Sequence, residues 1–302
     1  MTMPNFLIIG AAKSGTSSLH FYLAQPPEIY MTPDKQTYFF AYEGSEPEFG
    51  GPGDQMEMSR HLINSLEDYR AKFDGVTTER AIGEACSIYL YDAKAPAAIK
   101  RHIPDAKLII ILRDPAERAY SSFMQMIREG FEPVKDFGEA LKHEDERIAG
   151  KWRHLWHYRA RGYYYRQIRT YLELFDRSQL RIYLFEDLRD DPQALMKDIF
   201  RFLGVDDSFL PDTSGRYNAS GIPRSRTLLR LIMRPNLLKT LAKPLMPKAL
   251  RHEIKTFVTT SPWSLRRPPL DPQVRRDLVT GYRQDILKLQ GLLGRDLSGW
   301  MA

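Results

Sequence analysis

The residues best suited to chemistry lie near the N-terminus, in the segment "GAAKSGTSSL" from Gly10 to Leu19. An apolar run before Gly10 predicts a strand, the small residues predict a tight loop, and apolar residues at helical spacing from Thr16 predict a helix. A glycine-containing loop between a strand and a helix is typical of phosphate-binding sites. The order differs from the nucleotide-hydrolysing loop G-x-x-x-x-G-K-[ST], because here the lysine, Lys13, precedes Gly15.

A helix that begins near Thr16 points backbone N–H groups and the positive end of its dipole toward the loop, which favours an anion. Gly15 lets the backbone approach that anion, and Lys13 adds a mobile positive charge at the mouth of the loop. A plain strand-to-helix turn with an exposed lysine is the structural alternative. The candidate binding residues are Lys13, Ser14, Gly15, Thr16, Ser17 and Ser18.

A second informative segment is "KLIIILRDPAERAYSSFMQM", Lys107 to Met126. Its apolar strand ends in Arg113, where an ATPase or GTPase normally carries an acid that helps to hold magnesium. Asp114 precedes Pro115, which suits the first helical position, so we interpret Asp114 as a helix cap rather than a metal ligand. Arg113 and Ser121, two turns into that helix, can converge on a second anionic group. Two such sites at two strand ends suggest a doubly phosphorylated nucleotide.

Short apolar runs alternate with helical patterns, which predicts an α/β fold with a central parallel sheet flanked by helices. We expect strands at Phe6–Ile9, Ala81–Glu84, Lys107–Leu112 and Leu180–Phe185. We expect helices at Met56–Phe73, Ala93–His102, Pro115–Arg128, Tyr163–Phe175 and Pro192–Leu203, the last with Asp191 as its cap. A single domain over residues 1–302 fits this length.

Composition limits the function classes. The 44 basic and 38 acidic residues give a net charge of +6, which agrees with an anionic ligand without requiring one. Cys86 is the only cysteine, which excludes internal disulfides and cysteine-based zinc clusters. His154 and His157 lack an acidic partner, so we expect no metal. The apolar runs are too short to cross a bilayer, and we expect a cytoplasmic protein without a targeting segment or a nucleic-acid partner.

Several separated motifs resemble one known family, the sulfotransferases that use 3′-phosphoadenosine 5′-phosphosulfate (PAPS), and especially their bacterial and heparan-sulfate-type branch. The similar segments occur in family order over nearly the whole chain. They are "KSGTSSL", "GEACSIYL", "LRDPAERAYSSF", "RGYYYRQIRTYLELF", "RIYLFEDLRDDP", "RYNAS", "RPPLDP" and "LLGRDLSGW". The resemblance implies a P-loop-like sulfotransferase fold, a 5′-phosphosulfate in the first loop, and a 3′-phosphate at Arg113 and Ser121.

The resemblance also gives Lys13 a role. Negative charge grows on the bridging oxygen as the sulfonate leaves, and an ammonium group at the loop mouth can stabilise that charge in the transition state. The loop N–H groups then hold the product, 3′-phosphoadenosine 5′-phosphate (PAP). This mechanism requires no metal, in agreement with the missing acid at the strand end.

The base that takes the acceptor proton is less evident. In the heparan-sulfate-type branch a glutamate stands in a K-E-P-x-F-F-like segment, whereas this chain reads "DKQTYFF" with Gln36 at that position, and an amide cannot take a proton. Glu84, at the end of a predicted strand, is the first candidate and His20 is the second. Two alternatives remain. Glu84 could serve only as a structural acid, or the acceptor could be as acidic as a phenol and need little help from a base.

The most basic segment runs from Arg224 to Phe257, with leucines at helical intervals and prolines that divide it into short pieces. We interpret residues 224–262 as a basic, leucine-rich helical lid or surface segment. Residues 224–257 also suit peripheral contact with an anionic membrane, although packing on the main domain is the simplest interpretation. Arg224 and Arg226 are weaker candidates for the nucleotide 3′ side.

The function that we predict is transfer of a sulfonate from PAPS to a hydroxyl or amine of a small molecule or glycan, in one in-line step. Two alternatives remain open at this stage. A nucleotide kinase or hydrolase would share the strand, loop and helix but would need magnesium. A catalytically weak nucleotide-binding or membrane-associated protein would fit Gln36 and the basic segment.

Overall fold

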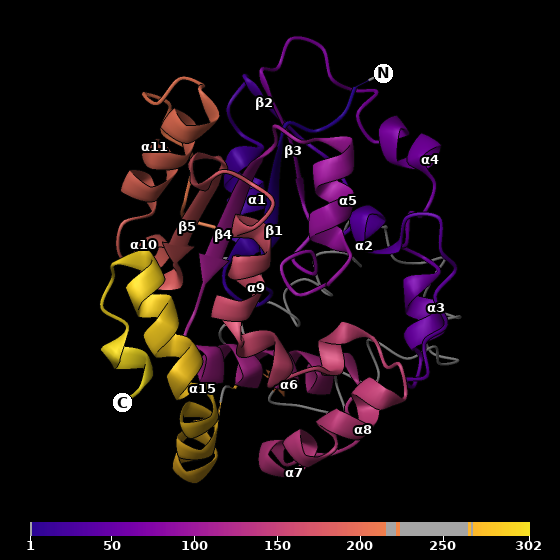
Figure 1. Ribbon diagram of the computed structural model, residues 1–302, viewed down its shortest axis with the longest axis vertical. Coiled ribbons are helices and arrows are strands. Elements are labelled where there is room, and N and C mark those ends of the chain that lie inside the picture. Colours follow the sequence, from indigo (N-terminus) through magenta and orange to yellow (C-terminus); the bar gives the residue numbers. More distant parts are fainter. Residues whose placement is uncertain (1, 216–221, 224–264, 267) are drawn as a thin grey trace, which may run out of the picture.

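A parallel sheet forms the centre of the molecule. The computed structural model describes residues 2–215, 222–223, 265–266 and 268–302, and its main sheet has five strands in the order β2-β3-β1-β4-β5 (Figure 1). These strands are β1 Phe6–Gly10, β2 Ile29–Met31, β3 Ala81–Ala85, β4 Lys107–Leu112 and β5 Leu180–Leu184. All neighbouring strands are parallel, so their carboxyl ends lie along one edge of the sheet.

Strand β1 lies in the middle of the sheet, between β3 and β4. In the register of the sheet, Phe6 is opposite Gly83 on one side and Lys107 on the other. Every residue of β1 is buried, and in β4 only Lys107 is partly exposed. A strand that is covered on both faces is apolar along its whole length, which is why β1 and β4 read as continuous aliphatic runs.

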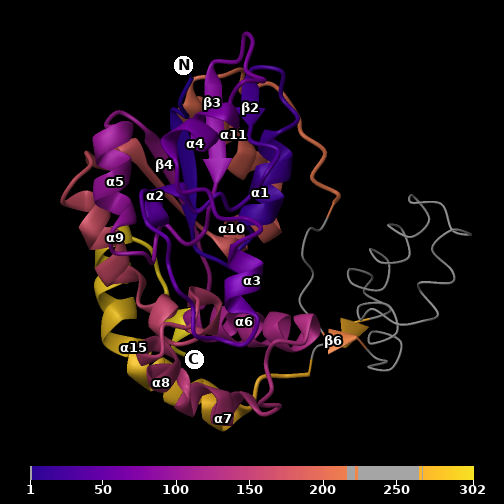
Figure 2. The same ribbon diagram turned by 90° about the vertical axis from the view of Figure 1, so that its right-hand side faces the viewer.

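Helices cover both faces of the sheet (Figure 2). Helices α1 (Thr16–Leu23) and α11 (Pro192–Leu203) lie on one side, while α5 (Ala95–His102) and α9 (Tyr164–Leu172) lie on the other. Successive strand residues point to opposite faces, so each strand contributes to two apolar clusters. Phe6, Ile8, Ile109 and Ile111 pack in one cluster, and Leu7, Ile9, Leu108 and Ile110 pack in the other.

The remaining elements surround this core. The α-helices are α2 Phe39–Tyr42, α3 Asp54–Met58, α4 Leu66–Ala71, α6 Pro115–Glu129, α7 Phe137–Lys142, α8 Glu144–Ala149, α10 Phe185–Asp190 and α15 Pro272–Leu293. Short 3₁₀ turns are η1 His154–Trp156, η2 Ala160–Gly162, η3 Arg177–Gln179 and η4 Ser298–Trp300. Strands β6 Ile222–Pro223 and β7 Leu265–Arg266 form a small antiparallel pair.

The predicted α/β class with its central parallel sheet is confirmed. The structure contains the four predicted strands, and the helices expected from residues 93, 115, 163 and 192 begin within two residues of those positions. The capping predictions are also confirmed. The Asp114 carboxylate accepts hydrogen bonds from the Ala116 and Glu117 amides, and Asp191 accepts one from the Ala194 amide.

The helix predicted at Met56–Phe73 is wrong. Two short helices, α3 and α4, occupy the ends of that range, and Ser65 begins the second by accepting a hydrogen bond from the Asp68 amide. A serine cap marks the start of a new helix and so interrupts the single helix that the apolar spacing predicts. Strand β2 and the 22-residue helix α15 were not predicted. The single-domain assignment stays a prediction, and residues 224–262 lie outside the described residues.

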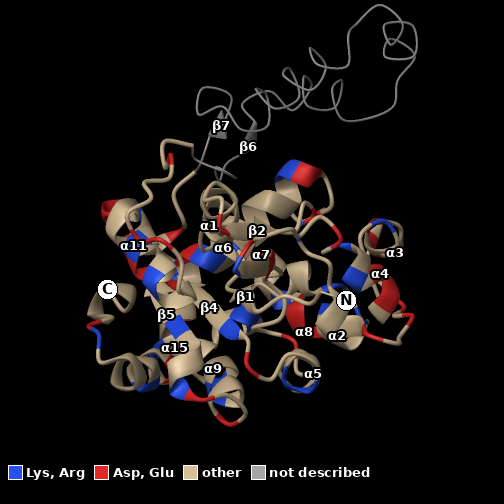
Figure 3. Cartoon of the chain, turned by 90° about the horizontal axis from the view of Figure 1, so that it is seen from above, with Lys and Arg blue, Asp and Glu red and all other residues tan. Residues whose placement is uncertain are grey.

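Acidic and basic residues are interspersed over the described helices when the molecule is viewed from above (Figure 3). None of the helices in the described part of the chain combines the length and the apolar character that crossing a bilayer requires. Within the same residues, no group of three or more histidine, cysteine, aspartate or glutamate side chains is placed to bind a metal ion.

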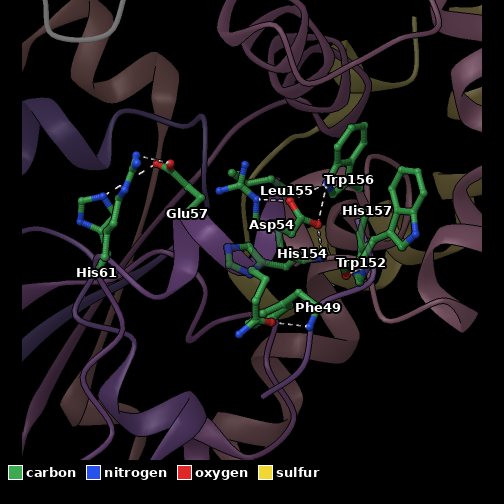
Figure 4. A network of polar contacts seen from close by, with 12 residues as sticks. Phe49, Asp54, Glu57, His61, Trp152, His154, Leu155, Trp156 and His157 are labelled. Carbon is green, nitrogen blue, oxygen red and sulfur yellow. Dashed lines mark hydrogen bonds and ion pairs between the residues drawn. The ribbon is translucent and has the colours of Figure 1, made fainter. Parts of the chain in front are cut away.

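A buried ion pair fastens α3 to the segment around η1. The Asp54 carboxylate, which has no exposed surface, accepts hydrogen bonds from Arg153 Nε at 2.6 Å and from Trp156 Nε1 at 2.9 Å (Figure 4). The second oxygen of the same carboxylate, Asp54 Oδ2, also accepts a hydrogen bond from the Arg153 amide. Removing one partner of such a pair leaves a buried charge without compensation, which is far more costly than losing an exposed pair.

We therefore expect Asp54→Ala to lower the free energy of unfolding by about 3–5 kcal/mol. Urea unfolding followed by tryptophan fluorescence measures the change. The control is Glu57→Ala on the same helix, whose partly exposed carboxylate lies 3.7 Å from Arg60 and 3.8 Å from His61 (Figure 4). The control variant should change the free energy by no more than about 0.5 kcal/mol, and equal losses in both variants would contradict the prediction.

Candidate functional site

The loop that joins β1 to α1 is shaped for close approach to a ligand. Gly15 precedes α1 with φ of 103°, a left-handed conformation, and a Cβ there would lie 2.6 Å from Leu188 Cδ2. A side chain at this position is therefore excluded both by the backbone conformation and by α10. Lys13 also has positive φ, at 69°, so the loop turns sharply on either side of Ser14.

The start of α1 offers hydrogen-bond donors that the described residues do not use. The residue before α1, Gly15, has no side chain that could cap the helix. The amides of Gly15, Thr16 and Ser18 donate to no acceptor in the described residues. The Ser14 hydroxyl is fully buried and has no partner there either. Unpaired donors together with the positive end of a helix dipole fit a phosphate or phosphosulfate group.

Two lysines converge on this loop. Lys13 belongs to it, and Lys35, in the segment after β2, donates a hydrogen bond of 2.6 Å to Ser17 Oγ. Burial, followed by the nearby Arg128 charge, lowers the pKa of Lys13 to about 7, and burial lowers the pKa of Lys35 to about 8. Keeping both lysines charged therefore costs free energy when no anion is bound. A bound anion would raise their pKa values again and stabilise the charged forms.

Lys35 was missed in the sequence analysis. The signal that was available is its position next to Gln36 in "DKQTYFF", the segment in which the base was sought. The contact with Ser17 depends on how the chain after β2 folds back over α1, and no local pattern reveals this.

Arg113 lies beside the same loop, as the order of β1 and β4 requires. Its Nη1 donates to the Lys13 carbonyl oxygen at 3.4 Å, and its Nη2 pairs with the Glu117 carboxylate at 3.1 Å. The guanidinium also stacks on the Phe185 ring, 5.0 Å from its centroid. Ser121 is buried one turn beyond Glu117 on α6. The structure therefore brings Arg113 to the loop, and the roles of Arg113 and Ser121 in binding stay predictions.

The Asp114 carboxylate is fully engaged in structural contacts. One oxygen caps α6, and the other accepts a hydrogen bond of 2.9 Å from Arg275 Nη2 on α15. These contacts agree with its interpretation as a cap.

Glu84 lies at the carboxyl end of β3 but is enclosed. It has no exposed surface, and its two oxygens accept hydrogen bonds from the hydroxyls of Thr37, Tyr69 and Tyr89, the Tyr69 bond being 2.6 Å long. Burial raises the pKa of this carboxyl above its usual value, against the effect of the hydroxyl donors. In this conformation Glu84 cannot touch an acceptor, so the geometry does not support it as the direct base.

The other two residues considered for the base occupy different surroundings. Gln36, with φ of 67°, donates from Nε2 to Ser87 Oγ at 2.9 Å, across the end of β3. His20 is buried on α1, and its Nδ1 has no partner among the described residues. Burial, and then the Lys35 charge, lower the pKa of His20 to about 4, which keeps its ring neutral and weakly basic at neutral pH.

The predicted roles of residues 224–262 as a lid, and of 224–257 as a membrane contact, lie outside the described residues. The same holds for Arg224 and Arg226. His154 begins η1 and His157 follows it. His157 Nδ1 and the Tyr91 hydroxyl oxygen are 3.0 Å apart and share a hydrogen bond, whose direction depends on the tautomer of the histidine. The structure thus brings together the loop, Lys35, Arg113 and the end of β3.

The chain is similar to proteins of one family. Residues 4–209 match the model of the sulfotransferase family. Among solved structures, a sulfotransferase from Alicyclobacillus acidocaldarius aligns over the full length of both chains with a TM-score of 0.78 and 34% identity.

Curated relatives share less sequence. The human bifunctional heparan sulfate N-deacetylase/N-sulfotransferase 3 is 28% identical over 311 residues, which cover 99% of this chain and 31% of that protein. The membrane-associated sulfotransferase kil1 of Dictyostelium discoideum is 28% identical over 152 residues, covering 48% of this chain and 28% of kil1. The chain therefore spans about a third or less of the length of these two relatives.

The low pKa of Lys13 predicts a particular pH dependence of stability. Its pKa is about 7 in the folded protein against 10.5 as the ordinary value, so between these values the unfolded chain binds more protons. Stability of the ligand-free protein should therefore rise as the pH increases from about 7 to about 9. Lys35 adds to the same slope above its own pKa of about 8.

We expect Lys13→Met to flatten this rise and to increase the urea midpoint most at the lower pH. Urea unfolding of the ligand-free protein across that range measures both effects. Lys142→Met, which removes an exposed ammonium group paired with Glu139, is the control and should leave the slope unchanged. A slope that is equally steep in Lys13→Met and in the unmodified protein would show that Lys13 is not desolvated.

Proposed function

The chain belongs to the sulfotransferase family and catalyses sulfonate transfer, and we propose that its donor is PAPS and its acceptor a hydroxyl or amine of a small molecule or glycan. The family and the enzyme class agree with the predictions from the sequence motifs. The human relative is named for its action on heparan sulfate, which supports glycans among the possible acceptors.

One observation carries the choice of donor: two cationic sites lie side by side at the carboxyl ends of β1 and β4. The loop after β1 supplies unpaired amides, the Ser14 hydroxyl and two lysines, and Arg113 after β4 contacts the carbonyl of Lys13. A nucleotide with phosphate groups at both its 5′ and 3′ positions can engage both sites. Ligands of parallel α/β sheets bind at this edge, which supports the assignment.

In the proposed mechanism the loop amides hold the 5′-phosphate while the acceptor oxygen or nitrogen attacks the sulfur in line. The S–O bond to the phosphate breaks as the new bond forms, and its electron pair stays on the phosphate oxygen. Lys13 stabilises that developing charge. Lys35, which contacts Ser17 in the same loop, adds a second positive charge. Because both ammonium groups are partly desolvated, their interaction with the new charge is stronger than in water.

We propose that Glu84 acts as a positioning residue. Its hydrogen bond from Thr37 anchors the segment that carries Lys35 and Gln36, so removing the carboxylate would release both. Because Gln36 cannot take a proton and the pKa of His20 is low, the favoured acceptor needs no base before attack. A phenol has already lost its proton to water as the phenolate, and a neutral amine of a glycan loses its proton to water after the N–S bond forms.

Lys13→Ala should lower kcat by about 10²-fold or more, because the lost contact is strongest in the transition state. The measurement is transfer of labelled sulfonate from PAPS to a panel of phenols and glucosamine-containing glycans, with and without a chelator. The control is Lys142→Ala, which removes an exposed lysine and should transfer at the unmodified rate. Unchanged turnover in Lys13→Ala would remove Lys13 from the mechanism.

Arg113→Met should weaken PAP binding by about 10-fold or more while affecting kcat less, because charge-assisted contacts to a phosphate contribute mainly to binding. Isothermal titration calorimetry with PAP measures the affinity. Arg177→Met, on η3 at the opposite end of β5, is the control and should bind PAP normally. Equal affinity in both variants would place the 3′-phosphate elsewhere.

A further inference from the structure

Four arginine side chains are buried in the described part of the chain: Arg118, Arg147, Arg153 and Arg161. Two of them are neutralised by buried carboxylates. Arg147 pairs with both oxygens of Glu132, at 2.8 and 2.9 Å, and Arg153 pairs with Asp54 at 2.6 Å. This is the normal condition for a buried charge, which is otherwise strongly disfavoured.

Arg118 and Arg161 form no ion pair with any described residue. Arg118 on α6 has no exposed surface, donates from Nη2 to the Tyr158 carbonyl oxygen, and leaves Nε and Nη1 without a partner. Arg161 in η2 makes one long hydrogen bond, 3.4 Å from Nη1 to the His154 carbonyl oxygen. Burial and the Arg118 charge lower the pKa of Arg161 to about 9, so the two guanidinium groups repel each other.

The neighbouring acid Glu144 does not resolve this imbalance. Glu144 on α8 is buried, but its two oxygens accept hydrogen bonds from the amides of Arg159 and Ala160, at 2.5 and 2.6 Å. The Glu144 carboxylate attracts the Arg118 guanidinium electrostatically but forms no hydrogen bond with it. One carboxylate that is already hydrogen-bonded cannot neutralise two guanidinium groups.

Both guanidinium groups line a narrow cleft beside the catalytic loop, which in this conformation is too tight for a water molecule, so an anion enters only if a lining side chain moves. The cleft is also lined by Ala11 and Ala12, which precede Lys13, and by Ser87 and Tyr91 after β3. Ser87 accepts the hydrogen bond from Gln36, so this cleft adjoins the segment that carries Lys35. The cleft lies where β1 and β3 end and also includes Arg118 of α6, the helix that follows β4, so it adjoins the site proposed for the donor.

We propose that Arg118 and Arg161 bind an acidic group of the acceptor, a carboxylate or a sulfate ester, and so select an anionic acceptor. The proposal rests on the sulfonate transfer proposed above. The unpaired N–H groups supply the donors that such an anion needs, and Ser87 supplies a hydroxyl. Arg161 is held by one long hydrogen bond and by its contact with the Tyr91 ring, 5.9 Å from the centroid, so turning its side chain to admit the anion breaks no ion pair with a described residue.

Sodium selenate tests the site directly, because selenium scatters anomalously and selenate mimics a sulfate ester. Crystals are grown with PAP, which occupies the donor phosphate sites, and are then soaked in selenate. We expect a selenium peak between Arg118 and Arg161 that is absent in Arg161→Met. The control is Arg159→Met, which removes an exposed guanidinium paired with Asp145 in the neighbouring position, and it should retain the peak. Selenate bound only elsewhere in the unmodified protein would overturn the proposal.

Stability separates a binding role from a structural one. In chloride buffer Arg161→Met should be at least as stable as the unmodified protein, since it removes an unpaired buried charge. Sulfate, at matched ionic strength and with PAP present, should raise the Tm of the unmodified protein by about 2 °C and leave Arg161→Met unchanged. A variant that unfolds more easily, with the sulfate response intact, would show that Arg161 serves the fold alone.

Kinetics with two matched phenols connects the site to the acceptor. Arg161→Met should raise KM for 4-hydroxyphenylacetate by about 10-fold and leave KM for 4-hydroxyphenylacetamide unchanged. Equal effects on both phenols, together with selenate in the cleft, would assign the site to a free anion and overturn its role in acceptor selection. Failure of both phenols to accept a sulfonate, or failure of PAP to bind, would count against the proposed function. The selenate and Tm measurements would still decide whether Arg118 and Arg161 bind an anion.

Discussion

Positive charge held partly away from water, at the carboxyl ends of β1 and β4, is the constraint on which the rest of the structure depends. Lys13, Lys35 and Arg113 lie around one loop, and among the described residues Glu117 is the carboxylate that pairs with them. Burial lowers the pKa of both lysines, so their desolvation is only partly offset within the chain itself. A nucleotide with several anionic groups supplies the missing compensation, and the free energy lost in desolvation returns as affinity and as stabilisation of the departing phosphate.

Such an arrangement requires a rigid surrounding structure. Strands β1 and β4 are buried on both faces, which fixes the loop start and Arg113 relative to each other. Glu84, enclosed by three hydroxyls, holds the segment of Lys35 and Gln36 against the end of β3. Away from the loop, two buried ion pairs join neighbouring elements: Asp54 of α3 pairs with Arg153 before η1, and Glu132 after α6 pairs with Arg147 of α8. Among the described buried arginines, the two without an ion pair, Arg118 and Arg161, lie beside the loop.

Much of this could be predicted from local sequence, and the remainder depends on tertiary contacts. Continuous aliphatic runs identified β1 and β4, and the aspartate and proline pairs at 114–115 and 191–192 located two helix starts. Strand β2 has three residues, too few for any period to emerge. The contact of Lys35 with Ser17 and the contacts of Glu84 with Tyr69 and Thr37 join residues that are 15 to 47 positions apart. Local sequence does not reveal Arg118 and Arg161 either, because they matter for a tertiary reason: no carboxylate of the described residues contacts them.

The position of β1 in the middle of the sheet has a consequence for the catalytic cycle. With β4 on one flank and β3 on the other, the loop after β1 lies between residues proposed for the nucleotide and residues proposed for the acceptor, and helix α6 carries residues of both sets. An acceptor bound on the β3 flank would leave the β4 flank uncovered, so release of the spent nucleotide would not require prior release of the acceptor.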